Sequence, residues 1–307
     1  MILCSGEALI DMLPRQSAGG EAVFAPYPGG AVFNTAIALG RLGQDVGLMT
    51  GLSTDLFGQR LDQALAASNV DASLAIRSGR PTTLAFVTLS EGQAEYAFYD
   101  ENTAGRMVRP ADLPATLPGV DALFFGGISL AVEPCAEAYE ALCLREGGRL
   151  PVMMDPNIRP GFIRDEARFR ARIARMLAVA DIVKLSDEDL HWLEGDGALR
   201  DLAARVLAQG PKLLCLTEGA KGVTGYTASG AVFVASQRVD VVDTVGAGDT
   251  FNAGFLASLQ SAGCLSKAAL VDLPEDALRV ALAYGGRAAA VTVSRAGANP
   301  PWASELA

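Results

Sequence analysis

The chain has 307 residues, of which 50% are hydrophobic and 20% charged, and its net charge is −10. This length and apolar content suffice for a large buried core. The acidic balance argues against nucleic acids and anionic membrane surfaces as partners, because both attract basic patches. No apolar run in the sequence is long enough to span a bilayer.

The N-terminus enters a predicted strand directly and lacks the basic start of a signal peptide, so we expect a cytoplasmic protein. The five cysteines are scattered and include no Cys-x-x-Cys pair, which favours buried thiols over disulfides or a zinc site. His191 is the only histidine, which leaves little room for Ser/His/Asp catalysis or a multi-histidine metal site.

Two features near the N-terminus predict a ligand site. The first strand is expected to end at Asp11, and ligands of open α/β sheets bind outside the carboxyl ends of the strands. Gly29 and Gly30 precede a predicted helix that has Asn34 on its first turn. Glycines let a ligand approach the backbone, and the Asn34 amide can both donate to and accept from the hydroxyl groups of a ligand.

Two stretches interrupt the α/β pattern. Residues 12–28 are punctuated by Gly and Pro and are not helical, and residues 82–99 predict two strands joined by a hairpin turn at residues 90–93. We expect a small antiparallel lid sheet, formed from about residues 12–28 and 82–104, that covers the site and excludes water. The alternative is an edge hairpin without a role in function.

From about residue 30 to the end, apolar strand-like runs alternate with segments of helical period. The alternation predicts a doubly wound, mostly parallel α/β sheet with helices on both faces, in a single domain over residues 1–307. The clearest predicted strands cover residues 45–53, 120–128, 151–157, 181–186 and 212–219. The predicted helices cover residues 31–42, 56–68, 133–146, 166–179 and 199–209.

Arg159 follows the predicted strand over residues 151–157 and presents a cation at the ligand edge of the sheet. We expect its guanidinium to face the ligands bound there, either phosphates or a hydroxyl that accepts a transferred group. A surface ion pair is the alternative interpretation.

The segment Asp243-Thr-Val-Gly-Ala-Gly-Asp249-Thr-Phe carries the strongest chemical signal. Residues 231–234 and 239–242 are rich in β-branched side chains and predict strands, and a helix is predicted to begin near Ala247. The N–H groups of Gly246, Ala247 and Gly248 then lie at the positive end of a helix dipole, where they suit a phosphate.

Asp249 stands beside this predicted anion site, where a carboxylate is useful if it takes a proton. The combination indicates phosphoryl transfer to a hydroxyl, with Asp249 as the base. Read alone, the motif also fits a simple helix cap. It is not a Walker A loop, and the first strand lacks the glycine turn of a nicotinamide-binding oxidoreductase.

The two glycine motifs together resemble those of the ribokinase-like carbohydrate kinases. The Gly-Gly pair with Asn34 is similar to that family's first signature and residues 243–249 to its second, in the same order and at a similar separation. The resemblance covers the whole chain and implies a ribokinase-like fold, with a sugar and ATP as ligands and Mg²⁺ as cofactor. Residues 6–11 and 96–102 resemble fructokinases most.

The resemblance also implies roles for individual residues. Asp249 is the implied base, and Gly246, Ala247 and Gly248 form the implied anion hole. The residues implied to hold the sugar are Asp11, Gly30 and Asn34, with Phe98 closing over it. The residues implied to bind the nucleotide are Thr217, Gly219, Lys221, Gly222 and Asn252, together with a helix over residues 283–290.

Two cation sites are implied in the same way. Ser186 and Asp189 stand where the family usually carries Asn-x-x-Glu, which positions magnesium and its waters. Asp189 would act through water, and neighbouring Glu188 is the rival. The implied potassium ligands are Asp243 and the backbone carbonyls near Val245, Arg295 and Gly297.

The family phosphorylates ketoses, ribose, nucleosides and 2-keto-3-deoxygluconate. An acidic sugar needs a cation, because a buried unpaired charge is costly. Tyr99 is followed by Asp100 and Glu101, which favours a neutral ketose, fructose first, phosphorylated on its primary hydroxyl. Arg106 swinging inward would support the keto-acid instead.

Two further expectations concern partners and activity. A homodimer through the lid sheet is implied by some relatives. A sugar- or nucleotide-binding module without turnover is the reading from another class, and the intact Asp249 argues against it.

Overall fold

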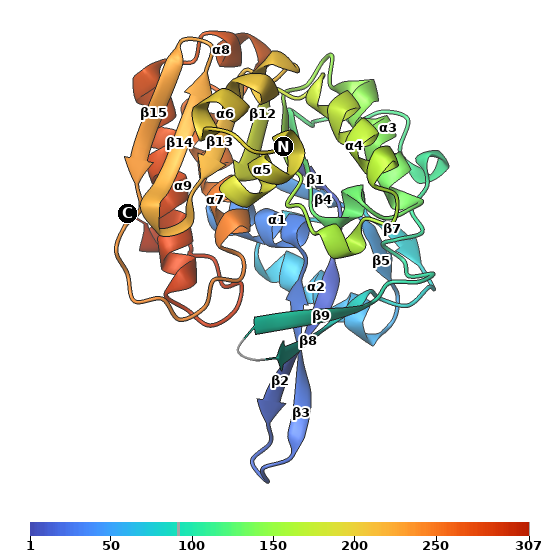
Figure 1. Ribbon diagram of the computed structural model, residues 1–307. Coiled ribbons are helices and arrows are strands. Elements are labelled where there is room, and N and C mark those ends of the chain that lie inside the picture. Colours follow the sequence, from blue (N-terminus) through green and yellow to red (C-terminus); the bar gives the residue numbers. More distant parts are fainter. Residues whose placement is uncertain (91–92, 307) are drawn as a thin grey trace.

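The computed structural model describes residues 1–90 and 93–306. Its centre is a nine-stranded sheet with helices on both faces (Figure 1). The strands of this sheet are β1 (Ile2–Ser5), β4 (Val46–Met49), β6 (Val70–Asp71), β10 (Ala122–Gly126), β11 (Val152–Asp155), β12 (Ile182–Ser186), β13 (Leu213–Thr217), β14 (Gly222–Thr227) and β15 (Gly230–Ala235). Their order is β15-β14-β13-β12-β11-β10-β1-β4-β6, parallel except for the β13–β14 and β14–β15 pairs, which confirms the predicted mostly parallel sheet.

Alternate strand residues send their side chains into two separate cores, as the two-residue period of a strand requires. Ile182 packs with the first core, and Val183 packs with the second. The helices that supply the first core are α1 (Ala31–Arg41), α2 (Leu56–Ala67), α7 (Ala247–Ser261), α8 (Lys267–Val271) and α9 (Glu275–Val293). Those that supply the second are α3 (Cys135–Glu146), α4 (Glu166–Leu177), α5 (Asp187–Glu194) and α6 (Leu199–Ala208).

Strand β1 marks the point at which the sheet is wound in both directions. The chain runs from β1 to β4 and β6 on one side, then returns to place β10 on the other side of β1. Ligand sites of open α/β sheets lie outside the carboxyl ends of the strands at such a point.

A second sheet stands off the body of the molecule (Figure 1). Its strands are β2 (Leu9–Gln16), β3 (Ala22–Gly29), β8 (Leu84–Ser90) and β9 (Gln93–Tyr99), in the order β3-β2-β8-β9. The predicted lid sheet is present, but it is mixed rather than antiparallel, because β2 and β8 pair in parallel. The predicted turn at residues 90–93 includes residues 91–92, which lie outside the described residues.

The prediction that Asp11 ends the first strand is wrong. Strand β1 stops at Ser5, and Asp11 lies inside β2, opposite Tyr27 of β3. Residues 6–8 cross from one sheet to the other, so Asp11 reaches the site from the lid sheet.

The strand predicted over residues 45–53 is two strands in different sheets. After β4 the chain turns at Thr50 into β5 (Gly51–Ser53), which pairs in parallel with β7 (Ile76–Ser78). A Cβ on Gly51 would come within 2.0 Å of the carbonyl oxygen of Ala104, so the close approach of that segment permits only glycine here.

The strand predicted over residues 239–242 is absent. Strand β15 is already the edge of the main sheet, and the backbone N–H groups of Val242 and Asp243 donate instead to Val293 O at the end of α9. Val241 is 64% exposed. Residues 239–242 are rich in β-branched side chains, but no neighbouring strand is available for them to pair with. The remaining predicted strands and helices are present with ends that differ by no more than two residues, except that the helix predicted over residues 283–290 is the middle part of the longer α9.

Within the part of the chain that the structure describes, no helix combines the length and the apolar character needed to cross a bilayer.

Candidate active site

A cavity of about 340 Å³ opens at the carboxyl end of the main sheet and is bordered by the lid sheet. It brings together residues from β2, α1, β9, the loop after β11, and the start of α7. The predicted site residues that line it are Asp11, Gly30, Asn34, Phe98, Arg159, Val245, Gly246, Ala247, Gly248 and Asp249. Two motifs more than two hundred residues apart therefore form one site.

The N-terminus of α7 faces this cavity. Gly246 precedes the helix with φ 78°, a left-handed conformation that favours glycine, and makes no side-chain capping contact. A Cβ on Gly246 would also lie 2.7 Å from the Cβ of Ala298. The Ala247 N–H makes a long 3.3 Å bond to Thr244 O, and the following first-turn amides have no partner within the helix by its geometry. This end of α7 suits an anion.

Asp249 lies on the first turn of α7 and is 8% exposed. Its Oδ2 accepts a 2.9 Å hydrogen bond from Nδ2 of Asn34. Burial raises the pKa of Asp249 to about 7, the neighbouring Asp155 adds to the rise, and the Asn34 hydrogen bond and the charge of Lys184 oppose it. A carboxylate with this pKa can accept a proton near neutral pH.

The lid sheet supplies the other wall of the cavity. Burial raises the pKa of Asp11 to about 6, and a Cβ on Gly29 would come within 2.1 Å of its Oδ2. Phe98 of β9 meets Phe162 edge to face, with ring centroids 4.1 Å apart. Both rings line the cavity, so the lid contacts the body at its rim.

Glu7 is a cavity residue that the sequence did not single out. Its carboxylate accepts hydrogen bonds from Ala31 N at 3.0 Å and Ser129 N at 3.3 Å, which ties the start of α1 to the loop after β10. A Cβ on Gly127 would lie 1.9 Å from Glu7 Oε1, so that carboxylate fills the space beside a glycine. Burial raises the pKa of Glu7.

Asp155 and Lys184 were also missed, although both line the cavity. Asp155 Oδ2 accepts from Lys184 Nζ at 3.1 Å and from Asn252 Nδ2 at 2.7 Å. Asp155 and Lys184 belong to apolar strand segments, and neither charged residue is part of a recognisable sequence motif. The only available signal was a charged residue inside a predicted buried strand.

The residues predicted to bind the nucleotide lie outside the lining of this cavity. Thr217 ends β13 and its hydroxyl donates to Leu185 O at 3.3 Å, and Lys221 forms an exposed ion pair with Glu218 at 3.2 Å. Gly219 lies in the turn between β13 and β14, Gly222 begins β14, and both have positive φ. Asn252 is 1% exposed and points to Asp155, not to the turn that carries these residues.

The predicted magnesium residues differ in their surroundings. Asp189 is 6% exposed and caps α5, accepting from Ser186 N at 3.3 Å and from Ile158 N at 2.9 Å. Glu188 is exposed. Residues 1–90 and 93–306 contain no group of three or more His, Cys, Asp or Glu side chains placed to hold a metal ion.

The residues predicted to bind potassium come together around Asp243. Its carboxylate accepts from Val245 N at 3.0 Å and from Gly297 N at 2.9 Å, which joins the loop before α7 to the loop after α9. The side chain of Arg295, in the loop after α9, pairs with Glu305.

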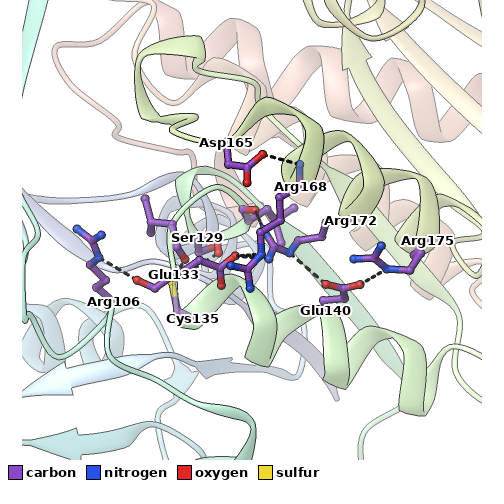
Figure 2. Close-up of polar contacts among 11 residues, drawn as sticks. Arg106, Ser129, Glu133, Cys135, Glu140, Asp165, Arg168, Arg172 and Arg175 are labelled. Carbon is purple, nitrogen blue, oxygen red and sulfur yellow. Dashed lines mark hydrogen bonds and ion pairs between the residues drawn. The ribbon is translucent and has the colours of Figure 1, made fainter.

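Arg106 does not line the larger cavity. Its Nη1 donates to Asp100 at 2.9 Å and its Nε donates to the carbonyl oxygen of Glu133 at 3.0 Å. Figure 2 shows this second contact beside the pairs that Glu133 makes with other arginines. Arg106 lines a separate cavity of about 130 Å³.

Arg159 lines the larger cavity, and its Nη1 donates to the carbonyl oxygen of Ile158 at 3.0 Å. Among the described residues it has no acidic partner within ion-pair distance, so the alternative of a surface ion pair finds no support there. A guanidinium at this place can meet a negative ligand.

Comparison with known proteins agrees with this geometry. The model for pfkB family carbohydrate kinases matches residues 1–305. A fructokinase of Rhizobium leguminosarum bv. trifolii is 56% identical over 279 residues, which are 91% of this chain and 86% of that protein.

Two solved structures share the architecture. A fructokinase from Xylella fastidiosa with bound ATP is 31% identical with a TM-score of 0.91, over 99% of this chain and 96% of that one. An aminoimidazole riboside kinase from Salmonella enterica, complexed with aminoimidazole riboside and an ATP analog, is 27% identical with a TM-score of 0.82, over 99% and 97%. The glycine-led start of α7 with Asp249 and the match along almost the whole chain lead to one conclusion: the chain belongs to the pfkB family of carbohydrate kinases.

Proposed function

We propose that this protein is an ATP-dependent fructokinase, which transfers the γ-phosphoryl group of Mg-ATP to a primary hydroxyl of fructose. The observation that carries the proposal is the position of Asp249, buried at the phosphate-binding end of α7 and facing the cavity that the lid sheet borders. The 56% identity to a fructokinase supports fructose as the sugar.

In the proposed reaction the oxygen of the sugar hydroxyl attacks the γ-phosphorus, and Asp249 accepts the proton of that hydroxyl. The N–H groups of Gly246, Ala247 and Gly248 stabilise the charge on the phosphoryl oxygens, because the start of α7 holds them at the cavity before the reaction begins. Arg159 faces the phosphates or the acceptor from the cavity wall.

A neutral sugar fits the charges of the cavity. Asp11, Asn34 and the backbone of Gly30 offer hydrogen-bonding groups to sugar hydroxyls, and Phe98 covers the sugar from the lid. The carboxylate of a keto-deoxygluconate would meet Asp11 and Glu7, while Arg106 is held elsewhere by Asp100. Repulsion and the lost pairing both favour the ketose.

The donor set fits magnesium as a companion of the nucleotide and not as the centre of a protein cage. Magnesium keeps several waters and usually binds one or two carboxylates together with phosphates. Asp189 is the better candidate than Glu188, because it bonds Ile158 N, and both neighbours of Ile158 line the cavity. When bound, the ion would offset charge on the phosphates.

We further propose that Asp243 and the carbonyls near Val245, Arg295 and Gly297 hold a potassium ion. The convergence of the two loops on Asp243 supports this. Thr217, Gly219, Lys221, Gly222 and Asn252 are proposed to serve the nucleotide, as the family resemblance implies.

Residues 1–307 are proposed to form one catalytic unit with the lid sheet inserted in it. Its five free cysteines fit the reducing cytoplasm. The outer face of the lid sheet is proposed to form a homodimer contact.

The test is sugar-dependent release of ADP from Mg-ATP, measured on fructose, tagatose, ribose, adenosine, aminoimidazole riboside and 2-keto-3-deoxygluconate. We expect strong turnover on fructose. The Asp249→Asn variant should bind ATP normally and lose at least roughly 10²-fold in kcat, the usual contribution of a positioned base.

Each other outcome has a defined meaning. Turnover on the keto-acid alone would replace fructose as the substrate, and turnover on a riboside alone would favour a nucleoside kinase. ATP binding without turnover on any sugar would support a non-catalytic module. A near-normal kcat for Asp249→Asn would refute its role as the base.

A further inference from the structure

Lys184 is an ionised side chain buried in the wall of the active-site cavity. It projects from β12, its side chain is 6% exposed, and it lines the same cavity as Asp249. Burying an ammonium is costly even when it is paired, and a well-packed apolar side chain in the same place is often no less stable. A stabilising role alone therefore accounts poorly for a lysine here.

The position of the ammonium is fixed from two sides. Asp155 Oδ2 lies 3.1 Å from Lys184 Nζ, and Asn252 holds the same oxygen from one turn further along α7 than Asp249. On the helix side, a Cβ on Gly248 would lie 3.2 Å from Nζ. The ammonium thus sits against the first turn of α7, whose amides form the proposed anion hole.

We propose that Lys184 is a catalytic residue, whose ammonium contacts the transferring phosphoryl group beside the Gly246–Gly248 amides. This inference rests on the proposed function. Asp155 and Asn252 are positioning residues that hold the ammonium in place. Neighbouring carboxylates keep the pKa of Lys184 above its ordinary value despite burial, so the cation persists at neutral pH.

Lys184 does not exchange a proton in the reaction. The sugar oxygen bonds to the γ-phosphorus, the bond from phosphorus to the bridging oxygen of ADP breaks, and the hydroxyl proton passes to Asp249. The ammonium meets the negative charge of the three transferring oxygens from a fixed position, with little reorganisation.

The experiment is a double-mutant cycle of Lys184→Met and Asp155→Asn. Lys184→Met alone leaves Asp155 buried without its cation and is expected to lower Tm. The double variant removes both charges and should recover Tm. If Lys184 is catalytic, kcat stays at least roughly 10²-fold below that of the wild-type protein in both Lys184→Met and the double variant, the cost of losing one charge-stabilising donor, while KM for the sugar changes little. If Lys184 only balances Asp155, kcat recovers with Tm in the double variant, which would overturn the proposal.

Lys267→Met is the matched control. Among the described residues Lys267 forms the other lysine–aspartate pair: its Nζ, at the start of α8, lies 2.7 Å from Asp181, the residue before β12, and it does not line the cavity. Its loss should lower Tm and leave kcat unchanged. A loss of kcat as large as that of Lys184→Met would mean that the activity merely follows stability.

A binding measurement separates this proposal from the choice of sugar. ADP with aluminium fluoride mimics the transferring phosphoryl group, and such analogues bind through contacts made in the transition state. Lys184→Met should weaken this complex at least roughly tenfold more than it weakens ADP alone, a part of the 10²-fold catalytic effect expected for one donor. Equal weakening of both ligands would refute a contact with the phosphoryl group, whichever acceptor the wild-type enzyme prefers. Failure of the wild-type protein to bind either nucleotide would refute the kinase itself.

Discussion

Asp249 is poised between two opposed influences. Burial raises its pKa to about 7, and the nearby Asp155 and Glu7 add to the rise. The hydrogen bond from Asn34 and the charge of Lys184 favour the ionised form and lower the pKa. A base must be ionised before the reaction yet basic enough to take a proton, and this balance provides both properties.

We expect kcat/KM to rise with pH through about 7, where Asp249 loses its proton in the free enzyme. Asn34→Leu removes the donor that stabilises the carboxylate, so the pKa rises and the acidic limb of the profile moves to higher pH. The measurement is the pH dependence of kcat/KM in both proteins.

Thr35→Val serves as the control for this shift. The Thr35 hydroxyl lies within hydrogen-bond distance of two backbone oxygens, Ala31 O at 3.0 Å and Asp249 O at 3.3 Å, and makes no bond to the Asp249 carboxylate. Its removal should leave the limb in place. If the acidic limb of the Asn34→Leu profile does not move, or moves to lower pH, its assignment to Asp249 is wrong.

The site residues that could be predicted from the sequence belong to patterns that are local in the chain, whereas those that were missed have partners far away in it. Asp249 could be predicted because the glycines that shape its surroundings are its neighbours in the chain. Lys184 gains its meaning from Asp155, twenty-nine residues away, and Glu7 from Ser129. Such contacts leave no local pattern, so only the fold could reveal them.

The close packing of helices α7 and α9 depends on two glycines, which have no side chain to keep the helices apart. Gly254 and Gly285 face each other where the two helices meet, and a Cβ on Gly254 would lie 2.9 Å from the Cα of Gly285. A Cβ on Gly285 would lie 2.9 Å from the carbonyl oxygen of Phe251 on α7. The close approach fixes α7, and with it the position of Asp249.

Gly285→Ala is therefore expected to destabilise the protein by about 1–3 kcal/mol, the usual cost of overpacking. Gly286 is the adjacent residue on the same helix, and a Cβ there would meet nothing within 4 Å. Gly286→Ala should stabilise by about 0.5–1 kcal/mol, because alanine loses less backbone entropy in a helix. Denaturant unfolding measures both changes. Equal effects of the two substitutions would show that α7 and α9 are not packed this closely.

At the scale of elements, hydrophobic period predicted the helices and central strands correctly, because these segments are buried in the manner that the period describes. It failed where pairing decides. Residues 239–242 have strand composition but follow the edge strand β15, and residues 45–53 divide at Thr50, beside Gly51, which Ala104 approaches closely. Neither the end of a sheet nor a close approach can be read from period.

At the scale of the whole molecule, the two faces of the lid sheet have different proposed roles: one borders the cavity and the other forms a dimer contact. One of its faces carries Asp11 and Phe98 to the cavity. The opposite face bears a row of rings in which Phe86 meets Phe24 at 5.0 Å and Tyr99 at 5.4 Å. Phe24 is 43% exposed and Tyr99 is 63% exposed. The β2–β3 hairpin projects from the body, so its own chain does not cover it (Figure 1).

We expect this outer face to pair with a second copy of the chain, because exposed aromatic side chains gathered on one face commonly mark an interface. Phe24→Glu would place a charge in that contact and should yield monomers, seen by sedimentation velocity across a range of concentrations. The monomer should show a raised KM for the sugar and an unchanged KM for ATP, since the lid sheet holds Asp11 and Phe98. Val280→Glu on α9 is the control: Val280 is 61% exposed and away from the lid, so its variant should match the wild-type protein in both respects. A wild-type protein that stays monomeric at every concentration would refute the dimer, and a dimer that survives Phe24→Glu would place the contact on another face.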